Sequence, residues 1–278
     1  EILMKELGLI SKLYINRFTD FGAYLALSDG GEVLLPKGYL KGEEKEGDEL
    51  EVFVYTDSED RPVAVTNRPT ALLDEFAVME AREITDFGAF MDWGLPKDLF
   101  VPKSEMGKTM EVGGKYLVMV CQDYKTNRLI GVSKYEDFIL SDTQAYAAGQ
   151  EVDALIFEET DLGFKTLIDG SYEGLIYKNE VFQPLKVGDK TKAFVKKRRD
   201  DGKIDLQLLP SGREKYEEGA EKILEALKVR KFLPLQDKSS PESIKELLGM
   251  SKKHFKQSIG QLYKAKKITI HVDGIRLV

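Results

Sequence analysis

The sequence predicts a mainly β protein, with three small five-stranded barrels in tandem followed by a small α+β domain. Three observations predict this fold class. One hexapeptide occurs three times, at residues 19–24, 85–90 and 160–165, and such regular self-similarity indicates an internal repeat. Short apolar runs separated by Gly, Asp and Pro follow each copy, as in strands joined by turns. Beyond residue 210 the apolar residues recur with the period of a helix.

The repeat extends beyond the hexapeptide. Each copy is followed by an apolar run that ends in lysine, and then by a glycine turn before another apolar run (Lys37 and Gly47, Lys103 and Gly113, Lys178 and Gly188). About 65 residues with five short strands fit a five-stranded barrel of the OB type. We therefore expect three OB-fold repeats, over residues 1–66, 75–134 and 149–210.

The hexapeptide is expected on the second strand of each barrel. It places Phe21 and Tyr24 in the first repeat at the positions of Phe87 and Phe90 in the second. The glycine between each pair predicts a β-bulge, which would let side chains three positions apart share one face. Exposed aromatic side chains on such a face are platforms for stacking nucleobases. Packing of these rings in the barrel cores is the alternative interpretation.

At these residues the chain resembles the RNA-binding repeat of the small-subunit ribosomal protein S-one. The second repeat matches best, with Phe-Gly-Ala-Phe at 87–90 and Leu-Phe-Val-Pro-Lys-Ser at 99–104. Pro102 stands at the position of the family's histidine, so that contact is missing. The resemblance implies that the RNA-facing residues of the second repeat are Phe87, Phe90, Asp123 and Arg128.

The other two repeats share parts of this pattern. In the first repeat Pro36 stands at the histidine position, and in the third Leu162 and Lys165 replace both second-strand aromatics. Tyr177 takes the histidine position of the third repeat and Lys203 its arginine position. The resemblance implies further RNA-facing residues: Phe21, Tyr24 and Arg61 in the first repeat, and Phe164, Tyr177 and Lys203 in the third.

Basic residues are concentrated late in the chain. The formal net charge is −7, but the first repeat has twice as many acidic as basic residues, whereas residues 211–278 have an excess of basic ones. Because phosphate binding depends on local clusters of Lys and Arg, we expect the first repeat to bind RNA least and to serve as a structural cap or protein contact. A run of four basic residues before the Asp200-Asp201-Gly202 turn predicts a hairpin that meets a phosphate backbone, the alternative being a solvated turn: Lys196, Lys197, Arg198 and Arg199.

Residues 211–278 are expected to form a winged helix of three helices and a two-stranded hairpin. Tyr216, Ala220 and Ile223 lie on one face of the first helix. The second helix is expected to begin at Ser240-Pro241 and to end at Gly249, and the third to begin at Ser251.

The second and third helices would make a helix-turn-helix, from which a recognition helix can enter a groove of nucleic acid. A contact with protein is the alternative. The basic residues that avoid the apolar stripe of the third helix, or follow it, are Lys252, Lys253, Lys256, Lys264, Lys266 and Lys267.

The sequence favours a non-catalytic protein without a metal or cofactor. The two histidines, His254 and His271, are expected at the surface, and the one cysteine, Cys121, is expected as a buried thiol, so no zinc site of the usual spacing forms. No Walker loop, nucleophile elbow or dinucleotide fingerprint occurs. The lack of an apolar run of ~18 residues and of a signal peptide predicts a cytoplasmic protein that contacts no membrane.

Three such barrels followed by a winged helix resemble the bacterial conserved virulence factor B family, over essentially all 278 residues. This resemblance implies an RNA-binding regulator that influences the expression of other genes post-transcriptionally. The expected partner is single-stranded RNA, and duplex nucleic acid, the ribosome and RNA polymerase are further candidates. Three alternatives stay open: a DNA-binding regulator led by the winged helix, a scaffold that docks on the ribosome or RNA polymerase, and a Mg²⁺-dependent nuclease.

Overall fold

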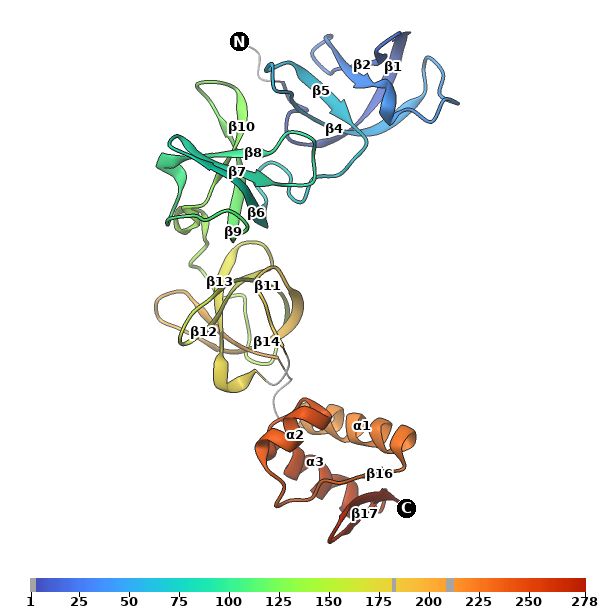
Figure 1. Cartoon of the computed structure of the whole chain (residues 1–278), viewed down its shortest axis with the longest axis vertical. Helices are drawn as coiled ribbons and strands as arrows, with labels where there is room; N and C mark the ends of the chain where they lie inside the picture. Colours follow the sequence, from blue (N-terminus) through green and yellow to red (C-terminus); the bar gives the residue numbers. More distant parts are fainter. Residues whose placement is uncertain (1–3, 182–183, 209–212) are drawn as a thin grey trace. The chain divides into compact units, whose positions relative to one another are not determined.

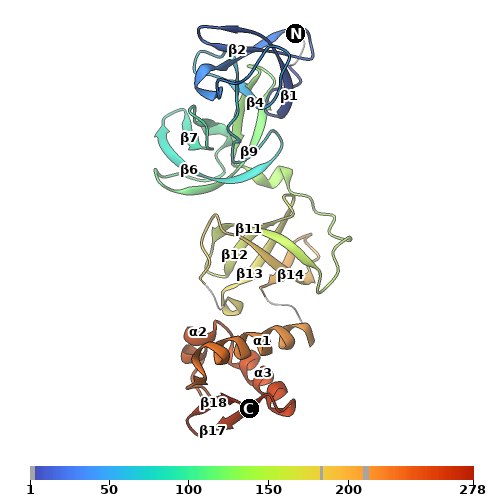
Figure 2. The ribbon, with the colours of Figure 1, turned by 90° about the vertical axis from the view of Figure 1, so that its right-hand side faces the viewer.

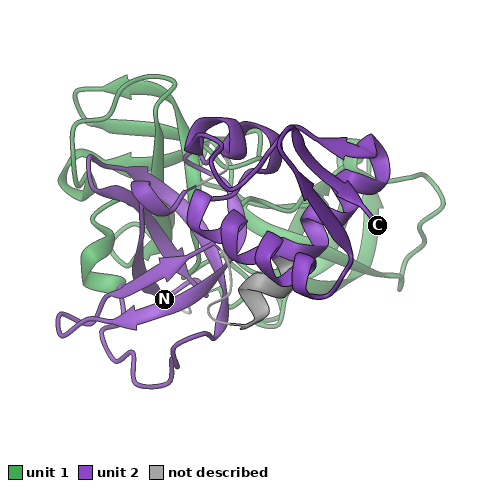
Figure 3. Ribbon diagram, turned by 90° about the horizontal axis from the view of Figure 1, so that it is seen from below, with its two compact units in different colours: residues 1–138 green, residues 139–278 purple. Residues whose placement is uncertain are grey.

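The computed structural model describes residues 4–181, 184–208 and 213–278, and the chain divides into two compact units, residues 1–138 and 139–278 (Figures 1 and 3). The first unit holds the first and second repeats. The second unit holds the third repeat and the helical C-terminal domain (Figure 2). Within the described residues, no helix is long and apolar enough to cross a membrane.

The first repeat is a closed barrel. Its strands are β1 (Ile10–Thr19), β2 (Gly22–Ala26), β3 (Glu32–Pro36), β4 (Glu49–Thr56) and β5 (Pro62–Val65), with a 3-10 turn, η1 (Lys37–Tyr39), after β3. They pair in the order β1-β2-β3-β5-β4, and the parallel pair β3–β5 joins the two halves. Inward side chains that alternate along the strands, such as Ile15, Leu25 and Leu35, are fully buried and form the core.

The second repeat has the same strand order but is an open sheet, so the expectation of three barrels is confirmed for two repeats and wrong for this one. At its edges, β8 and β10 meet through side chains: a Cβ on Gly131 would lie 2.6 Å from Cγ2 of Val101. The elements are β6 (Phe76–Thr85), β7 (Gly88–Asp92), β8 (Leu99–Pro102), η2 (Lys103–Glu105), β9 (Lys115–Asp123), β10 (Arg128–Val132) and η3 (Tyr135–Phe138).

A further hydrophobic core cluster spans the first and second repeats. Trp93 of the second repeat is 2% exposed and packs edge-on against Phe53 and Tyr55 of β4, with ring centroids 5.7 and 6.2 Å apart. Its indole Nε1 donates a hydrogen bond to the carbonyl oxygen of Lys97 at 2.7 Å. Burial of Tyr55 beside Trp93 raises the pKa of its hydroxyl to about 12. The two repeats are therefore held together as one body by apolar contacts.

The third repeat is again a closed barrel. Three consecutive parallel pairs, from Gly174 with Ile204 to Ile176 with Leu206, join its two halves. The elements are β11 (Glu151–Glu159), β12 (Gly163–Ile168), β13 (Tyr172–Tyr177), η4 (Lys178–Glu180), β14 (Lys190–Arg198) and β15 (Ile204–Gln207).

The C-terminal domain has the expected three helices and terminal hairpin. Ser240 and Ser251 cap the second and third helices through their side chains, and Gly249 ends the second in a left-handed conformation, as predicted. The side chain of Tyr216 lies outside the described residues. A short extra strand, β16, pairs with β18 and was not predicted. The elements are α1 (Arg213–Arg230), β16 (Phe232–Leu233), α2 (Pro241–Leu248), α3 (Lys252–Lys264), β17 (Ile268–His271) and β18 (Gly274–Leu277).

His254 does not lie at the surface as expected but is 2% exposed, beneath α1. It follows the cap of α3 and precedes Phe255, whose ring is fully buried in the core of the domain. The two helices approach closely here, because a Cβ on Gly219 of α1 would lie 2.2 Å from Nε2 of His254. The glycine thus permits this helix crossing, and the crossing covers the imidazole.

Candidate nucleic-acid interface

The repeated hexapeptide folds into a turn that exposes an aromatic ring. In the second repeat, Oγ1 of Thr85 accepts a hydrogen bond from the backbone N–H of Phe87 at 3.3 Å and donates one to the carbonyl of Gly88 at 3.1 Å. The side chain of Phe87 is 80% exposed, and that of Phe21 in the same turn of the first repeat is 75% exposed. Both rings precede the second strand instead of lying on it, and the β-bulge lies in the first strand of each repeat.

Glycine is needed in this turn because the next strand comes very close. A Cβ on Gly88 would lie 2.1 Å from the carbonyl oxygen of Val101, and its φ of 156° also favours glycine. The ring of Phe100 lies over the same glycine and packs against Phe90, with centroids 5.0 Å apart. Three aromatic residues, Phe87, Phe90 and Phe100, therefore gather at one end of the second repeat.

The aromatic position after the turn has a different neighbour in each repeat. In the first, the guanidinium of Arg17 lies 4.0 Å from the ring centroid of Tyr24 and is held there by Glu32. One face of Tyr24 is thereby already covered by a cation. In the second, the residue that pairs with Phe90 across the strands is Glu83, which offers no cation to cover the ring. Among the described residues, the second repeat therefore combines an exposed aromatic turn with a second aromatic, Phe90, that no described cation covers.

In the third repeat, Lys165 stands at this position and forms an ion pair with Glu158 at 2.8 Å. Phe164 is 7% exposed and packs in the barrel core, so the expectation that it faces RNA is wrong. It occupies the place of Ala89, which also points inward because side chains alternate along a strand. Leu162, at the tip of the turn, is 59% exposed.

The turn between β9 and β10 holds the two other predicted residues of the second repeat. Asp123 accepts hydrogen bonds from Oγ1 of Thr126 at 2.7 Å and from the N–H of Lys125 at 3.0 Å. These bonds lower the pKa of Asp123, so its carboxylate stabilises the turn. Arg128 forms an ion pair with Asp60 of the first repeat. Tyr124, which is 81% exposed, was missed, although an aromatic residue between Asp123 and Arg128 is a readable signal.

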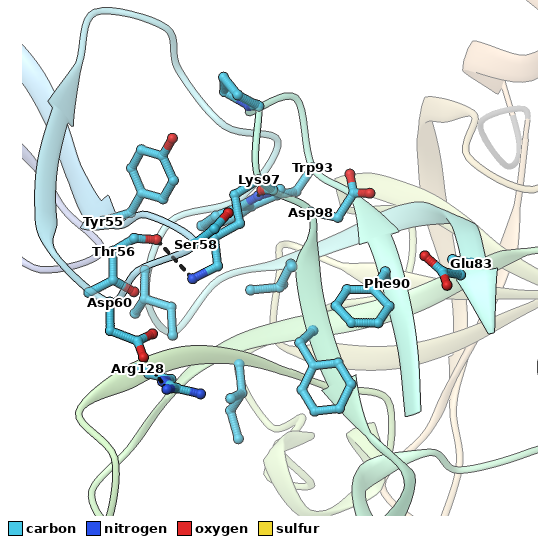
Figure 4. Close-up of a pocket in the computed structure, with 15 residues that line it drawn as sticks. Tyr55, Thr56, Ser58, Asp60, Glu83, Phe90, Trp93, Lys97, Asp98 and Arg128 are labelled. Atoms are coloured by element: carbon cyan, nitrogen blue, oxygen red, sulfur yellow. Dashed lines mark hydrogen bonds and ion pairs between the residues drawn. The ribbon is translucent and has the colours of Figure 1, made fainter. Parts of the chain in front are cut away.

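A groove of about 550 Å³ lies between the β4–β5 turn of the first repeat and the β8 and β10 edges of the second (Figure 4). Phe90 and Phe100 line the side formed by the second repeat, and Ser58 and Asp60 line the opposite side. Figure 4 shows Arg128 and Asp60 facing each other beside this groove. The groove thus offers aromatic surface and the cations Arg128 and Lys97, and the carboxylates of Asp60, Glu83 and Asp98 also line it.

Most predicted cations of the third repeat are paired with acidic residues. Lys203 forms an ion pair with Glu173 at 2.8 Å. Lys196 forms one with Glu180, and its Nζ lies 5.8 Å from the ring centroid of Tyr177. The remaining pairs are Arg199 with Asp201 at 3.0 Å and Arg199 with Asp205 at 4.0 Å.

A basic hollow lies beside the end of β14. Arg198 donates a hydrogen bond to the carbonyl of Gln144 at 3.2 Å, which brings residues 143–148 against the basic run. All four side chains from Lys196 to Arg199 line this hollow. Lys197 is exposed and has no ion-pair partner among the residues that the structure describes. The hollow could therefore accept a phosphate through Lys197 without first breaking an ion pair.

The predicted lysines of the winged helix lie on its surface. Lys252 is half-buried at the start of α3, and Lys253, Lys256 and Lys264 are exposed along it. Lys266 and Lys267 are exposed in the turn before β17. Within the described ranges, none of these six forms an ion pair, in contrast to most of the barrel cations that were predicted to bind RNA. Phosphate binding at this surface would therefore require no internal pair to be broken.

Comparison with known proteins follows the same division of the chain. Residues 7–67 match the S1 domain family, and residues 221–277 match the CvfB-like winged helix domain family. Conserved virulence factor B of Staphylococcus aureus strain USA300 is 27% identical over 239 residues, which cover 83% of this chain and 80% of that protein. The chain is a relative of the conserved virulence factor B proteins.

Two further proteins are similar over most of the chain. Protein YitL of Bacillus subtilis strain 168 is 28% identical over 265 residues, which cover 92% of this chain and 88% of that protein. A crystal structure described as a multidomain protein with nucleic acid binding domains, from Streptococcus pneumoniae, is 26% identical and covers 98% of this chain and 99% of that chain, with a TM-score of 0.46. The matches of this chain to the S1 and winged-helix domain families support nucleic-acid binding.

The described residues contain no group of three or more His, Cys, Asp or Glu that could hold a metal ion. Cys121 lies half-buried on β9, and burial raises the pKa of its thiol to about 11. The thiolate, which is the reactive form, is therefore scarce near neutral pH.

We expect the folded protein to react with a disulfide reagent at pH 8 roughly a hundredfold more slowly than a free cysteine does. Absorbance of the released thiol measures the rate, and the same protein in denaturant is the control. Equal rates in the folded and denatured protein would contradict the raised pKa of the Cys121 thiol.

Proposed function

We propose that the protein binds single-stranded RNA without cleaving it and influences gene expression post-transcriptionally. The observation that carries the proposal is the aromatic cluster of the second repeat, where Phe87 is 80% exposed next to the Phe90–Phe100 pair. Bases of a single strand can stack on such rings, whereas the bases of a duplex are stacked on each other. The match to S1 and winged-helix domains supports a binding protein instead of an enzyme.

In this proposal the third repeat and the winged helix add backbone contacts. Lys197 and the exposed lysines of α3 are free to meet phosphates, and their contribution falls as salt rises. Domains connected in one chain bind the same strand with an increased effective concentration. The aromatic cluster would thus hold the bases, and the basic surfaces would hold the backbone.

A DNA-binding regulator led by the winged helix is the second candidate, because the six lysines of α3 and its following turn are unpaired among the described residues. It predicts tight binding to duplex DNA that depends on α3 alone.

Fluorescence anisotropy of the full chain with labelled single-stranded RNA and a duplex DNA of matched length, each at two salt concentrations, separates the two candidates. The proposal predicts tighter binding to the RNA, and only a partial loss when Lys253 and Lys256 are replaced by glutamine. Preference for the duplex, abolished by the same two substitutions, would assign the function to the winged helix. Absence of binding to either would favour a scaffold that docks on protein.

A further inference from the structure

Arg128 is the predicted RNA-facing cation of the second repeat, and its partner comes from another domain. Asp60 lies in the β4–β5 turn of the first repeat, 68 positions earlier in the chain. The corresponding cations of the other repeats are held within their own domain, Arg61 by Asp57 and Lys203 by Glu173. The pair between Arg128 and Asp60 is therefore particular to the junction of the first two repeats.

The β4–β5 turn is built to present Asp60. Oδ1 of Asp57 accepts hydrogen bonds from the backbone N–H groups of Glu59 and Arg61 at 2.8 and 3.0 Å. The guanidinium of Arg61 binds Oδ2 of Asp57 at 2.7 Å and a carboxylate oxygen of Glu59 at 2.9 Å. These bonds neutralise Arg61 within the turn, so that Asp60 reaches outward to Arg128.

The second repeat holds this turn in place. Nζ of Lys97 donates a hydrogen bond to the backbone carbonyl of Thr56 at 3.1 Å (Figure 4). It donates a second one to the backbone carbonyl of Asp57 at 2.7 Å. The chain segment that carries Lys97 is anchored in turn by Trp93, whose Nε1 binds its carbonyl. The turn is thus a fixed wall of the groove, and only side chains need to move for Arg128 to change partner.

The groove has the properties of a nucleotide pocket. The ring pair of Phe90 and Phe100 offers a stacking surface on one side, and Arg128 offers a donor for an anion at the rim. The side chains of Arg128 and Asp60 are 51% and 42% exposed. An ion pair this exposed to water is weak, so a phosphate can compete with the carboxylate for the guanidinium.

We propose that the first repeat completes the nucleic-acid site of the second. Its β4–β5 turn forms one side of a pocket for one nucleotide of single-stranded RNA. Asp60 stays paired with Arg128 until the phosphate of that nucleotide displaces the carboxylate. The first repeat then acts on RNA binding through a single carboxylate, although its own aromatic Tyr24 is covered by Arg17. This inference rests on the proposed binding of RNA by the second repeat.

Substitution of Asp60 by Asn tests the inference, with Glu59→Gln as the matched control. Both changes remove one negative charge from the same turn, but Glu59 contacts Arg61 and does not line the groove. Asp60 has a φ of 62°, which Asn tolerates well, so the turn should keep its shape. Circular dichroism confirms that each variant is folded.

The inference predicts that Asp60→Asn binds single-stranded RNA roughly threefold or more tightly than Glu59→Gln. The slope of log affinity against log salt should stay the same, because the phosphate contacts Arg128 in both variants. The difference in affinity should vanish when Arg128 is also replaced by Gln. Equal affinities for Asp60→Asn and Glu59→Gln, or a gain that persists without Arg128, would overturn the inference. If the wild-type chain binds no RNA, the proposed function fails as well.

Discussion

Replacement of both Phe87 and Phe90 by alanine is expected to weaken the binding of single-stranded RNA by about tenfold or more. Stacking of a base on an aromatic side chain contributes about 1–3 kcal/mol, and these two rings offer surface for one or two bases. Phe87 is 80% exposed in the β6–β7 turn, so its removal leaves no cavity in the protein. Anisotropy titration of the full-length double variant at fixed salt measures the loss.

Phe21→Ala is the matched control for this experiment. Phe21 lies in the same turn of the first repeat and is 75% exposed, but the neighbouring Tyr24 is covered by Arg17 and the first repeat is strongly acidic. We expect a change of less than about twofold, because an isolated ring in a negative field binds RNA poorly. Unchanged affinity in the folded Phe87 and Phe90 double variant would remove the second repeat from the site.

The second large effect concerns the stability of the winged helix. Gly219→Ala is expected to destabilise it by about 1–3 kcal/mol, the usual result of forcing a methyl group into a packed core. The new Cβ would lie 2.2 Å from Nε2 of His254 and 2.4 Å from Oγ of Ser258, both of which are buried. This cost exceeds the gain of about 1 kcal/mol that alanine gives over glycine in a helix. Thermal unfolding followed at 222 nm measures it, because all α-helices among the described residues belong to this domain.

Gly260→Ala provides the opposite case. Gly260 lies within α3, and a Cβ there would meet nothing within 4 Å. Helix propensity then acts without a steric cost, and we expect the domain to become more stable by up to about 1 kcal/mol. If both alanine variants shifted the melting temperature in the same direction, the close crossing of α1 over α3 would be wrong.

The features that the sequence predicted correctly are those with a local chemical signature. The repeated hexapeptide marks the start of the second strand of each repeat, because only glycine fits beneath the carbonyl of the next strand, although its first aromatic residue lies in the preceding turn and not on the strand as predicted. Ser240, Gly249 and Ser251 mark helix ends, because each satisfies backbone groups within its own helix terminus. Such signals need no knowledge of distant residues.

The features that were missed depend on residues far apart in the chain. Whether β8 and β10 close a barrel is decided by side chains such as Val101 over Gly131, which no short window contains. Burial of Phe164 follows from strand alternation, which the resemblance at this position obscured. The partner of Arg128 lies in another domain, so the pair with Asp60 appears only in three dimensions.

The central claim is that the aromatic cluster of the second repeat contacts the bases of single-stranded RNA. Ultraviolet cross-linking of the full chain to RNA, followed by mass spectrometry of the cross-linked peptides, tests this claim most directly. The account predicts cross-links in the peptide that contains residues 85–90, at Phe87 or Phe90, and their loss when both residues are alanine. Cross-links confined to residues 213–278, with none in the second repeat, would contradict it.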